Sequence, residues 1–217
     1  MLADMLRALV FDFDGLMVDT ETVIIEAWER IHAHDGFAAD RAVLHALVGH
    51  TDIVQDVWTA YPPNHDKHAL GRRWRDLSRS LMDAAPVLPG VRELLDSARA
   101  AGLRLAVASN SNRPHVKNHL RLRGLDTLFD AICTRDEVQH PKPAPDVYLE
   151  ALRRLGVAPG ETLAFEDSVP GHLAAHRAGL RVIVIPGPST LHDEFPHAAL
   201  RLPTLAGLTL ETLNSRF

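Results

Sequence analysis

The sequence contains almost no cysteine and no long apolar run, and these two absences exclude several classes of protein. A single cysteine, Cys133, occurs among the 217 residues, so no disulfide can form within the chain. This composition favours a reducing compartment. No apolar run approaches the roughly 20 residues that are needed to cross a bilayer, and residues 1–14 have neither the apolar segment nor the cleavage site of a signal peptide. We therefore expect a cytoplasmic protein without a membrane partner.

An excess of positive charge is absent as well. Lysine and arginine number 23 against 28 aspartate and glutamate residues, which gives a formal net charge of −5. Proteins that bind nucleic acid without sequence specificity need a basic surface, so we expect no nucleic-acid partner. Nothing in the sequence indicates an obligate protein partner. A small anionic ligand remains compatible with this composition, because the local charge around a site governs its binding.

What the sequence does contain is a regular alternation of apolar runs and amphipathic helical patterns. The predicted strands are Ala8–Phe11, Leu103–Ala108, Phe129–Cys133, Thr162–Phe165 and Arg181–Ile185, and the predicted helices, each followed by glycine, are Val91–Ala101, Pro145–Leu155 and Val169–Ala178. Apolar strands that alternate with helices are typical of a parallel sheet covered on both faces. We therefore predict an α/β fold with a Rossmann-like parallel sheet flanked by helices.

The segment from residue 20 to residue 85 has a different pattern, with helical periodicity and no convincing strand. Its predicted helices are Thr22–His34, Arg41–Leu47, Ile53–Tyr61 and Lys67–Met82. We therefore expect an all-helical domain of residues 20–85, inserted after the first strand into an α/β core made of residues 1–19 and 86–217.

Polar and charged residues follow the predicted strands at the points where the strands end. These residues are Asp12 and Asp14 after the first strand, Ser109 and Asn110 after the second, Lys142 in the loop that follows Cys133, and Glu166 and Asp167 after a later strand. In parallel α/β sheets, ligands bind beyond the carboxyl ends of the strands. If the strands are neighbours, these side chains converge on one place.

The chemistry of this set is coherent. Several carboxylates cannot all stay ionised in a small site without a cation, and Mg²⁺ prefers carboxylate oxygens together with substrate phosphate. A carboxylate can attack phosphorus to give an aspartyl-phosphate, while a second carboxyl group transfers the proton. A lysine and a serine hydroxyl can hold phosphoryl oxygens.

Each motif also has a structural explanation when it is taken alone. Asp12 and Asp14 could be turn or capping residues, Ser109–Asn110 and Glu166–Asp167 could cap helices, and Lys142 could be a solvated lysine. The occurrence of all four at matching strand ends, in one order, favours a functional site.

The same motifs give the chain a family resemblance. Asp-Phe-Asp-Gly at 12–15, Ser-Asn at 109–110, Lys-Pro-Ala-Pro-Asp at 142–146 and Glu-Asp-Ser at 166–168 resemble the haloacid dehalogenase-like hydrolase superfamily. Within it, the chain is most similar to the β-phosphoglucomutase-like and phosphoglycolate phosphatase-like branch, in which a helical cap follows the first motif. The resemblance covers residues 8–186.

The resemblance implies a role for each motif residue. Asp12 would be the nucleophile and a Mg²⁺ ligand, and Asp14 would be the general acid and base, with its main-chain carbonyl bound to the metal. Ser109 and the Asn110 amide would bind the phosphoryl group, and Lys142 would neutralise the charge of the nucleophile and the phosphoryl group. Asp167 would be a metal ligand, and Glu166 would bind the metal directly or through water. The helical insert would be a cap that closes over the site.

Two positions depart from the phosphomutases of this branch. These enzymes have a histidine where this chain has Ile24, and a phosphate-binding arginine where it has Asp52. The dehalogenases lack the second aspartate and the metal, so the presence of Asp14 and Asp167 disfavours that chemistry. We predict a Mg²⁺-dependent phosphatase acting on a small phosphorylated metabolite, with a sugar phosphate as the expected substrate. The alternatives are a β-phosphoglucomutase-like phosphomutase and a non-catalytic metabolite-binding relative.

Basic residues outside the motifs give weaker predictions. Arg113 is a candidate for substrate binding by its position just after the second strand, and an exposed surface role is equally open. His115 and His119, like His172 and His176, are spaced as a pair on one helix face, which could hold a transition metal. No third ligand is fixed in the sequence, so we expect these histidines at helix surfaces.

Overall fold

The computed structural model describes residues 6–47 and 56–217. The chain divides into two units, one made of residues up to 18 together with residues 86–217, and the other made of residues 19–85. Among the described residues, no helix combines the length and the apolar character needed to cross a membrane.

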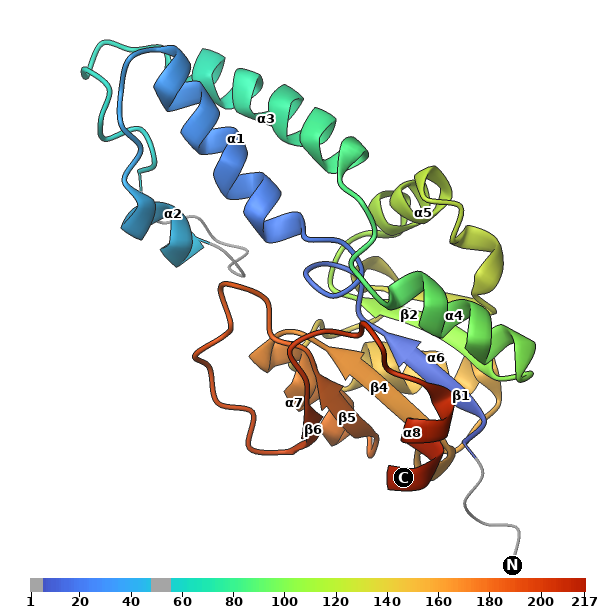
Figure 1. Ribbon diagram of the computed structural model, residues 1–217. Coiled ribbons are helices and arrows are strands. Elements are labelled where there is room, and N and C mark those ends of the chain that lie inside the picture. Colours follow the sequence, from blue (N-terminus) through green and yellow to red (C-terminus); the bar gives the residue numbers. More distant parts are fainter. Residues whose placement is uncertain (1–5, 48–55) are drawn as a thin grey trace, which may run out of the picture. The chain divides into compact units, whose positions relative to one another are not determined.

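The first unit is built on a six-stranded parallel sheet, which confirms the predicted fold class (Figure 1). Its spatial order is β3-β2-β1-β4-β5-β6, with β1 at Ala8–Phe11, β2 at Arg104–Ser109, β3 at Ala131–Thr134, β4 at Thr162–Glu166, β5 at Arg181–Val184 and β6 at Ala198–Arg201. In the pairing register, Phe11 lies level with Val107 of β2 and Phe165 of β4. Asp12 therefore leaves β1 beside the last residues of β2 and β4.

Helices cover both faces of this sheet. They are α4 at Val91–Ala100, α5 at Arg113–Leu122, α6 at Asp146–Leu155, α7 at Val169–Arg177 and α8 at Leu210–Arg216, with 3₁₀ turns η1 at Asp126–Leu128, η2 at Arg135–Glu137 and η3 at Pro159–Glu161. Figure 1 shows α4 and α8 in front of the sheet and α6 and α7 behind it. The strand residues facing α6 and α7 include Val10, Ala106 and Ala164, all fully buried. Neither β6 nor α8 is among the elements predicted from the sequence.

The second unit is helical, as its sequence pattern predicts. Its helices are α1 at Thr20–His34, α2 at Arg41–Leu47 and α3 at Lys67–Ala84. An aromatic cluster joins α1 to α3: the Trp28 ring stacks on Trp74 at 4.5 Å and meets Trp58, which precedes α3, edge-on at 4.4 Å. These tryptophans form part of the hydrophobic core of this unit.

One predicted helix of this unit is wrong in its described part. For the range predicted as Ile53–Tyr61, the structure describes residues 56–61, and these form turns. Asp56 accepts a hydrogen bond from the Trp58 amide at 3.1 Å, and Pro62 disfavours a helical conformation at the residue before it. Both features replace helical hydrogen bonding with a local turn. Asp52, one of the two predicted departures from the phosphomutase pattern, lies outside the described residues.

Candidate active site

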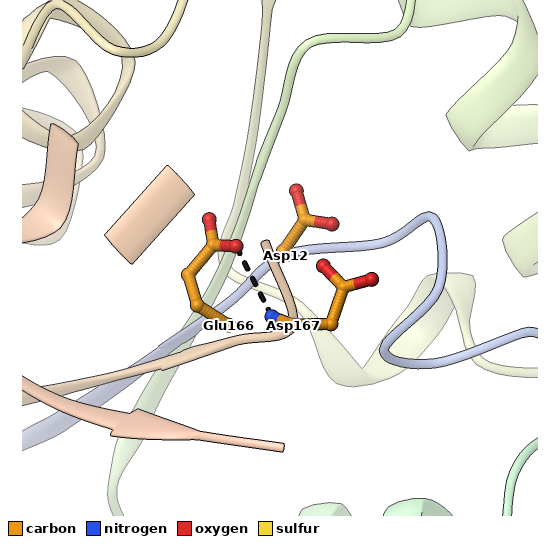
Figure 2. A group of neighbouring side chains, drawn as sticks. All are labelled: Asp12, Glu166 and Asp167. Carbon is orange, nitrogen blue, oxygen red and sulfur yellow. Dashed lines mark hydrogen bonds between the residues drawn. The ribbon is translucent and has the colours of Figure 1, made fainter. Parts of the chain in front are cut away.

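Three carboxyl groups gather at the ends of β1 and β4. Asp12 follows β1, Glu166 ends β4, and Asp167 follows it. One oxygen from each lies within 4.8 Å of the others, and all three residues are buried. Figure 2 shows the three side chains side by side, with the Asp167 amide donating to Glu166 at 3.2 Å. Their proximity follows from the parallel register that aligns the two strand ends.

Lys142 supplies the positive charge within this cluster. Its ammonium nitrogen Nζ lies 2.5 Å from Asp12 Oδ1 and 2.6 Å from Glu166 Oε1, and 3% of its side chain is exposed. The Asn110 side chain holds the backbone of Lys142 at two points, accepting from its amide at 2.8 Å and donating to its carbonyl at 3.2 Å. The Asn110 side chain thus fixes the loop that delivers Lys142.

Glu166 receives hydrogen bonds on both of its oxygens. The Tyr148 hydroxyl donates to Oε1 at 2.5 Å, while the Ser168 hydroxyl donates to Oε2 at 3.3 Å. Gly171 of α7 comes so close that a Cβ there would lie 2.0 Å from this carboxylate. Tyr148 is not among the site residues predicted from the sequence. Its only signal was a place on the buried face of α6, where a tyrosine hydroxyl needs a partner.

Backbone packs tightly against Asp167. Gly15 has a φ of +79°, and a Cβ added there would lie 1.9 Å from Asp167 Oδ2. A glycine is therefore required on both conformational and steric grounds. The Thr190 hydroxyl donates to the Asp167 carbonyl at 2.7 Å, so the loop after β5 also holds this residue. No sequence motif indicated Thr190.

The Asp14 side chain turns toward the segment that follows β2. Its Oδ2 accepts from Ser111 Oγ at 2.6 Å and from Ser109 Oγ at 3.4 Å, while Oδ1 pairs with His115 Nε2 at 3.1 Å. Ser109 Oγ in turn accepts from the Ser111 amide at 2.9 Å. The Asp14 side chain therefore contacts the end of β2 and the start of α5. Its backbone lies two residues after Asp12 of the carboxylate cluster.

The prediction that the paired histidines lie at helix surfaces is wrong for two of them. His119 and His172 are buried. The His119 ring packs near Phe13 at 6.3 Å, and His172 Nε2 accepts from the His197 amide at 3.2 Å. The i,i+4 spacing placed each pair on one helix face but did not reveal that this face packs inward.

Arg113 lies outside the carboxylate cluster. Its guanidinium donates to the Ile132 carbonyl of edge strand β3 at 2.8 Å and to both Glu137 oxygens at 3.0 Å. Of the residues predicted for the site, the structure brings together Asp12, Lys142, Glu166 and Asp167. Asn110 is bonded to the backbone of Lys142, while Ser109 and Asp14 are bonded to each other.

The electrostatics of the cluster are dominated by burial. Burial raises the pKa of Asp12 to about 8, the charges of Glu166 and Asp14 add to this rise, and Lys142 opposes it. Burial lowers the pKa of Lys142, but Asp12 and Glu166 outweigh that effect and leave it above its usual value. Burial and the Glu166 charge hold the pKa of Tyr148 well above normal.

The donor set of this cluster fits Mg²⁺. Asp12, Glu166 and Asp167 offer carboxylate oxygens only, within 4.8 Å of one another, and such hard oxygen ligands are what Mg²⁺ prefers. One lysine ammonium cannot balance three buried carboxylates. A divalent cation would complete the charge balance and supply positive charge for phosphate binding.

Comparison with known proteins identifies relatives along nearly the whole chain. The family model described as haloacid dehalogenase-like hydrolase matches residues 9–185. CbbY from Rhodobacter capsulatus is 35% identical, over 96% of this chain and 97% of its own. Hexitol phosphatase B from Escherichia coli strain K12 is 32% identical, over 95% and 96%. The crystal structure of CbbY from Rhodobacter sphaeroides in complex with phosphate is 33% identical, covers 94% of this chain and 96% of its own, and superposes with a TM-score of 0.74.

Proposed function

The chain belongs to the haloacid dehalogenase-like hydrolase family, and from this we propose that it is a Mg²⁺-dependent phosphatase that hydrolyses a small phosphomonoester. A sugar phosphate is the expected substrate class, which the name of the relative hexitol phosphatase B supports. The observation that carries the proposal is the buried contact between Lys142 and Asp12 at the end of β1, inside a group of carboxylates.

Asp12 acts as the nucleophile in this proposal. Its carboxylate oxygen attacks phosphorus, the bond from phosphorus to the leaving oxygen breaks, and an aspartyl-phosphate forms. Asp14 donates a proton to the leaving oxygen and later takes one from the water that attacks the phosphorus. That second attack releases inorganic phosphate and restores the Asp12 carboxylate.

The surrounding residues stabilise the charge that moves during these steps. The Lys142 ammonium, 2.5 Å from Asp12 Oδ1, favours the ionised nucleophile and offsets charge on the phosphoryl oxygens. Ser109 and the Asn110 amide hold those oxygens. Mg²⁺, when bound by Asp12, Asp167, the Asp14 carbonyl and, directly or through water, Glu166, supplies further positive charge to the phosphoryl group. Arg113 has no role in this mechanism, because its guanidinium already donates hydrogen bonds to Glu137 and to the Ile132 carbonyl.

The phosphomutase alternative has less support. The position where phosphomutases of this branch carry a histidine is occupied by Ile24, which packs against the aromatic cluster of the helical unit. A coupled assay with β-glucose 1-phosphate should detect no glucose 6-phosphate. Formation of that product would make the mutase reading the better one.

A phosphate-release screen tests the proposed function. Purified protein with Mg²⁺ should release phosphate from at least one compound in a panel of sugar phosphates, nucleotides, phosphoglycolate and an aryl phosphate. Asp12→Asn should lower turnover by at least about 1000-fold, as removal of a nucleophile does in other enzymes, while the variant remains folded. A wild-type protein inactive on the whole panel would refute the function. Substantial turnover by Asp12→Asn would refute the role of Asp12.

A further inference from the structure

His115 contacts the proposed acid and base, Asp14, whereas its helical spacing alone predicts a place at a helix surface. Its Nε2 lies 3.1 Å from Asp14 Oδ1, and Ser111 Oγ lies 2.6 Å from Asp14 Oδ2. The two residues therefore hold different oxygens of the same carboxyl group. His115 and Asp14 are separated by 101 positions in the chain, so this contact is a product of the fold.

The start of α5 fixes where the His115 ring lies. The Asn112 side chain caps the helix by accepting from the His115 amide at 2.9 Å. The ring then packs edge-on against Phe13 at 5.9 Å and against His119 at 4.5 Å. The capped backbone and the two ring contacts favour the orientation in which Nε2 faces Asp14.

We infer that His115 is a positioning residue for Asp14, and this inference rests on the proposed phosphatase function. A general acid must have its proton within hydrogen-bond reach of the leaving oxygen. A carboxyl group held at one oxygen can rotate about its last bond, whereas donors on both oxygens fix its plane. His115 and Ser111 together set that plane, and a catalytic group has to be held close to its productive geometry.

Two variants of His115 distinguish a positioning role from a purely structural role, because the two roles predict that a different variant loses activity. His115→Phe keeps an aromatic ring against Phe13 and removes the donor. His115→Gln keeps an N–H donor and removes the ring. If His115 positions Asp14, the phenylalanine variant is the impaired one. If His115 only fills space beside Phe13, the glutamine variant is the impaired one.

Leaving-group dependence separates positioning of the acid from general damage. A sugar alkoxide needs a proton to leave, whereas 4-nitrophenolate departs without one, and kcat/KM reports the step in which the leaving group departs. With glucose 6-phosphate, or whichever hexose phosphate the wild-type protein hydrolyses faster, His115→Phe should lower kcat/KM by about 10-fold. With 4-nitrophenyl phosphate the loss should stay within about 2-fold, and His115→Gln should recover most of the sugar-phosphate activity.

A readout without turnover keeps this inference separate from the proposed function. Crystal structures of the wild-type protein and of His115→Phe should show one Asp14 carboxyl orientation in the former and more than one in the latter. A single unchanged orientation in the variant, or equal losses on both substrates, would overturn the positioning role. An inactive wild-type protein would refute the phosphatase proposal, while the crystal structures would still decide whether His115 fixes Asp14.

Discussion

Lys142 is the position where stability and chemistry can be tested together. Lys142→Met keeps the apolar stem of the side chain and removes the ammonium that lies 2.5 Å from Asp12 and 2.6 Å from Glu166. Both partners are buried, with 9% of the Asp12 side chain and 0% of the Glu166 side chain exposed. Breaking a buried ion pair on one side costs about 3–5 kcal/mol, because the remaining charge stays buried without its partner.

The expected loss is large enough to measure directly. For a chain of this size, each kcal/mol lowers Tm by about 2–4 °C, so Lys142→Met should unfold about 6–20 °C below the wild type. Scanning calorimetry in metal-free buffer is the suitable assay. The three tryptophans, Trp28, Trp58 and Trp74, all belong to the helical unit, so their fluorescence would not follow the unit that contains Lys142.

An exposed lysine provides the matched control for this variant. Lys117 lies on the exposed face of α5, and Lys117→Met removes the same charge without uncovering a buried partner. Its Tm should stay within about 1 °C of the wild type, since surface substitutions change stability by less than about 0.5 kcal/mol. Equal unfolding temperatures for Lys142→Met and Lys117→Met would refute the argument that this ion pair is a buried element of the fold.

Two further predictions follow from close contacts and from pKa shifts. Gly171→Ala would place a Cβ 2.0 Å from the Glu166 carboxylate, so we expect a loss of about 1–3 kcal/mol from overpacking. Gly160→Ala, which meets nothing within 4 Å, should unfold near the wild-type temperature, and equal denaturant midpoints for the two variants would contradict the steric argument. In the helical unit, the hydrogen bond from Arg73 is the main cause that holds the pKa of Asp35 below its usual value. The ionised carboxylate therefore adds stability above the unfolded-state pKa of about 4, and that stability is lost as the pH falls through the folded-state pKa. Arg73→Met should raise the Asp35 pKa and weaken this acid dependence, as a carbon-13 NMR titration would detect. An unchanged pKa would show that Arg73 is not its cause.

Periodicity and strand-end logic predicted the sheet and the meeting of the carboxylates. Alternating strands and helices led to a parallel sheet, and parallel register then brings Asp12 beside Glu166. Strand β6 was not predicted, because its sequence pattern is weak. Strand β6, Ala198–Arg201, alternates between partly buried and exposed positions and carries two alanines, so it lacks the dense apolar run that marked the central strands.

Contacts between distant elements were beyond the reach of the sequence pattern. Helical periodicity places Tyr148 on the buried face of α6, but it does not say that the hydroxyl reaches Glu166 on β4. Proximity to a strand end favoured Arg113 as a substrate ligand, yet a long side chain can turn away, and its partner Glu137 lies 24 positions further along the chain. For His115 the sequence pattern predicted only a place at a helix surface, although the residue contacts Asp14. This contact could not be predicted from local spacing, because Asp14 precedes His115 by 101 positions.

The charge balance at Asp12 links the fold to the proposed binding of a cation. Burial raises the pKa of Asp12 to about 8 even though Lys142 opposes the rise. A protonated carboxyl group is not a nucleophile, so the proposed role of Asp12 needs neighbouring groups that favour its ionised form. The Lys142 ammonium also pairs with Glu166, so Asp12 is not its only ionic partner. A divalent cation bound beside Asp12 and Asp167 would lower the Asp12 pKa, and in the proposed mechanism it would therefore favour the ionised nucleophile.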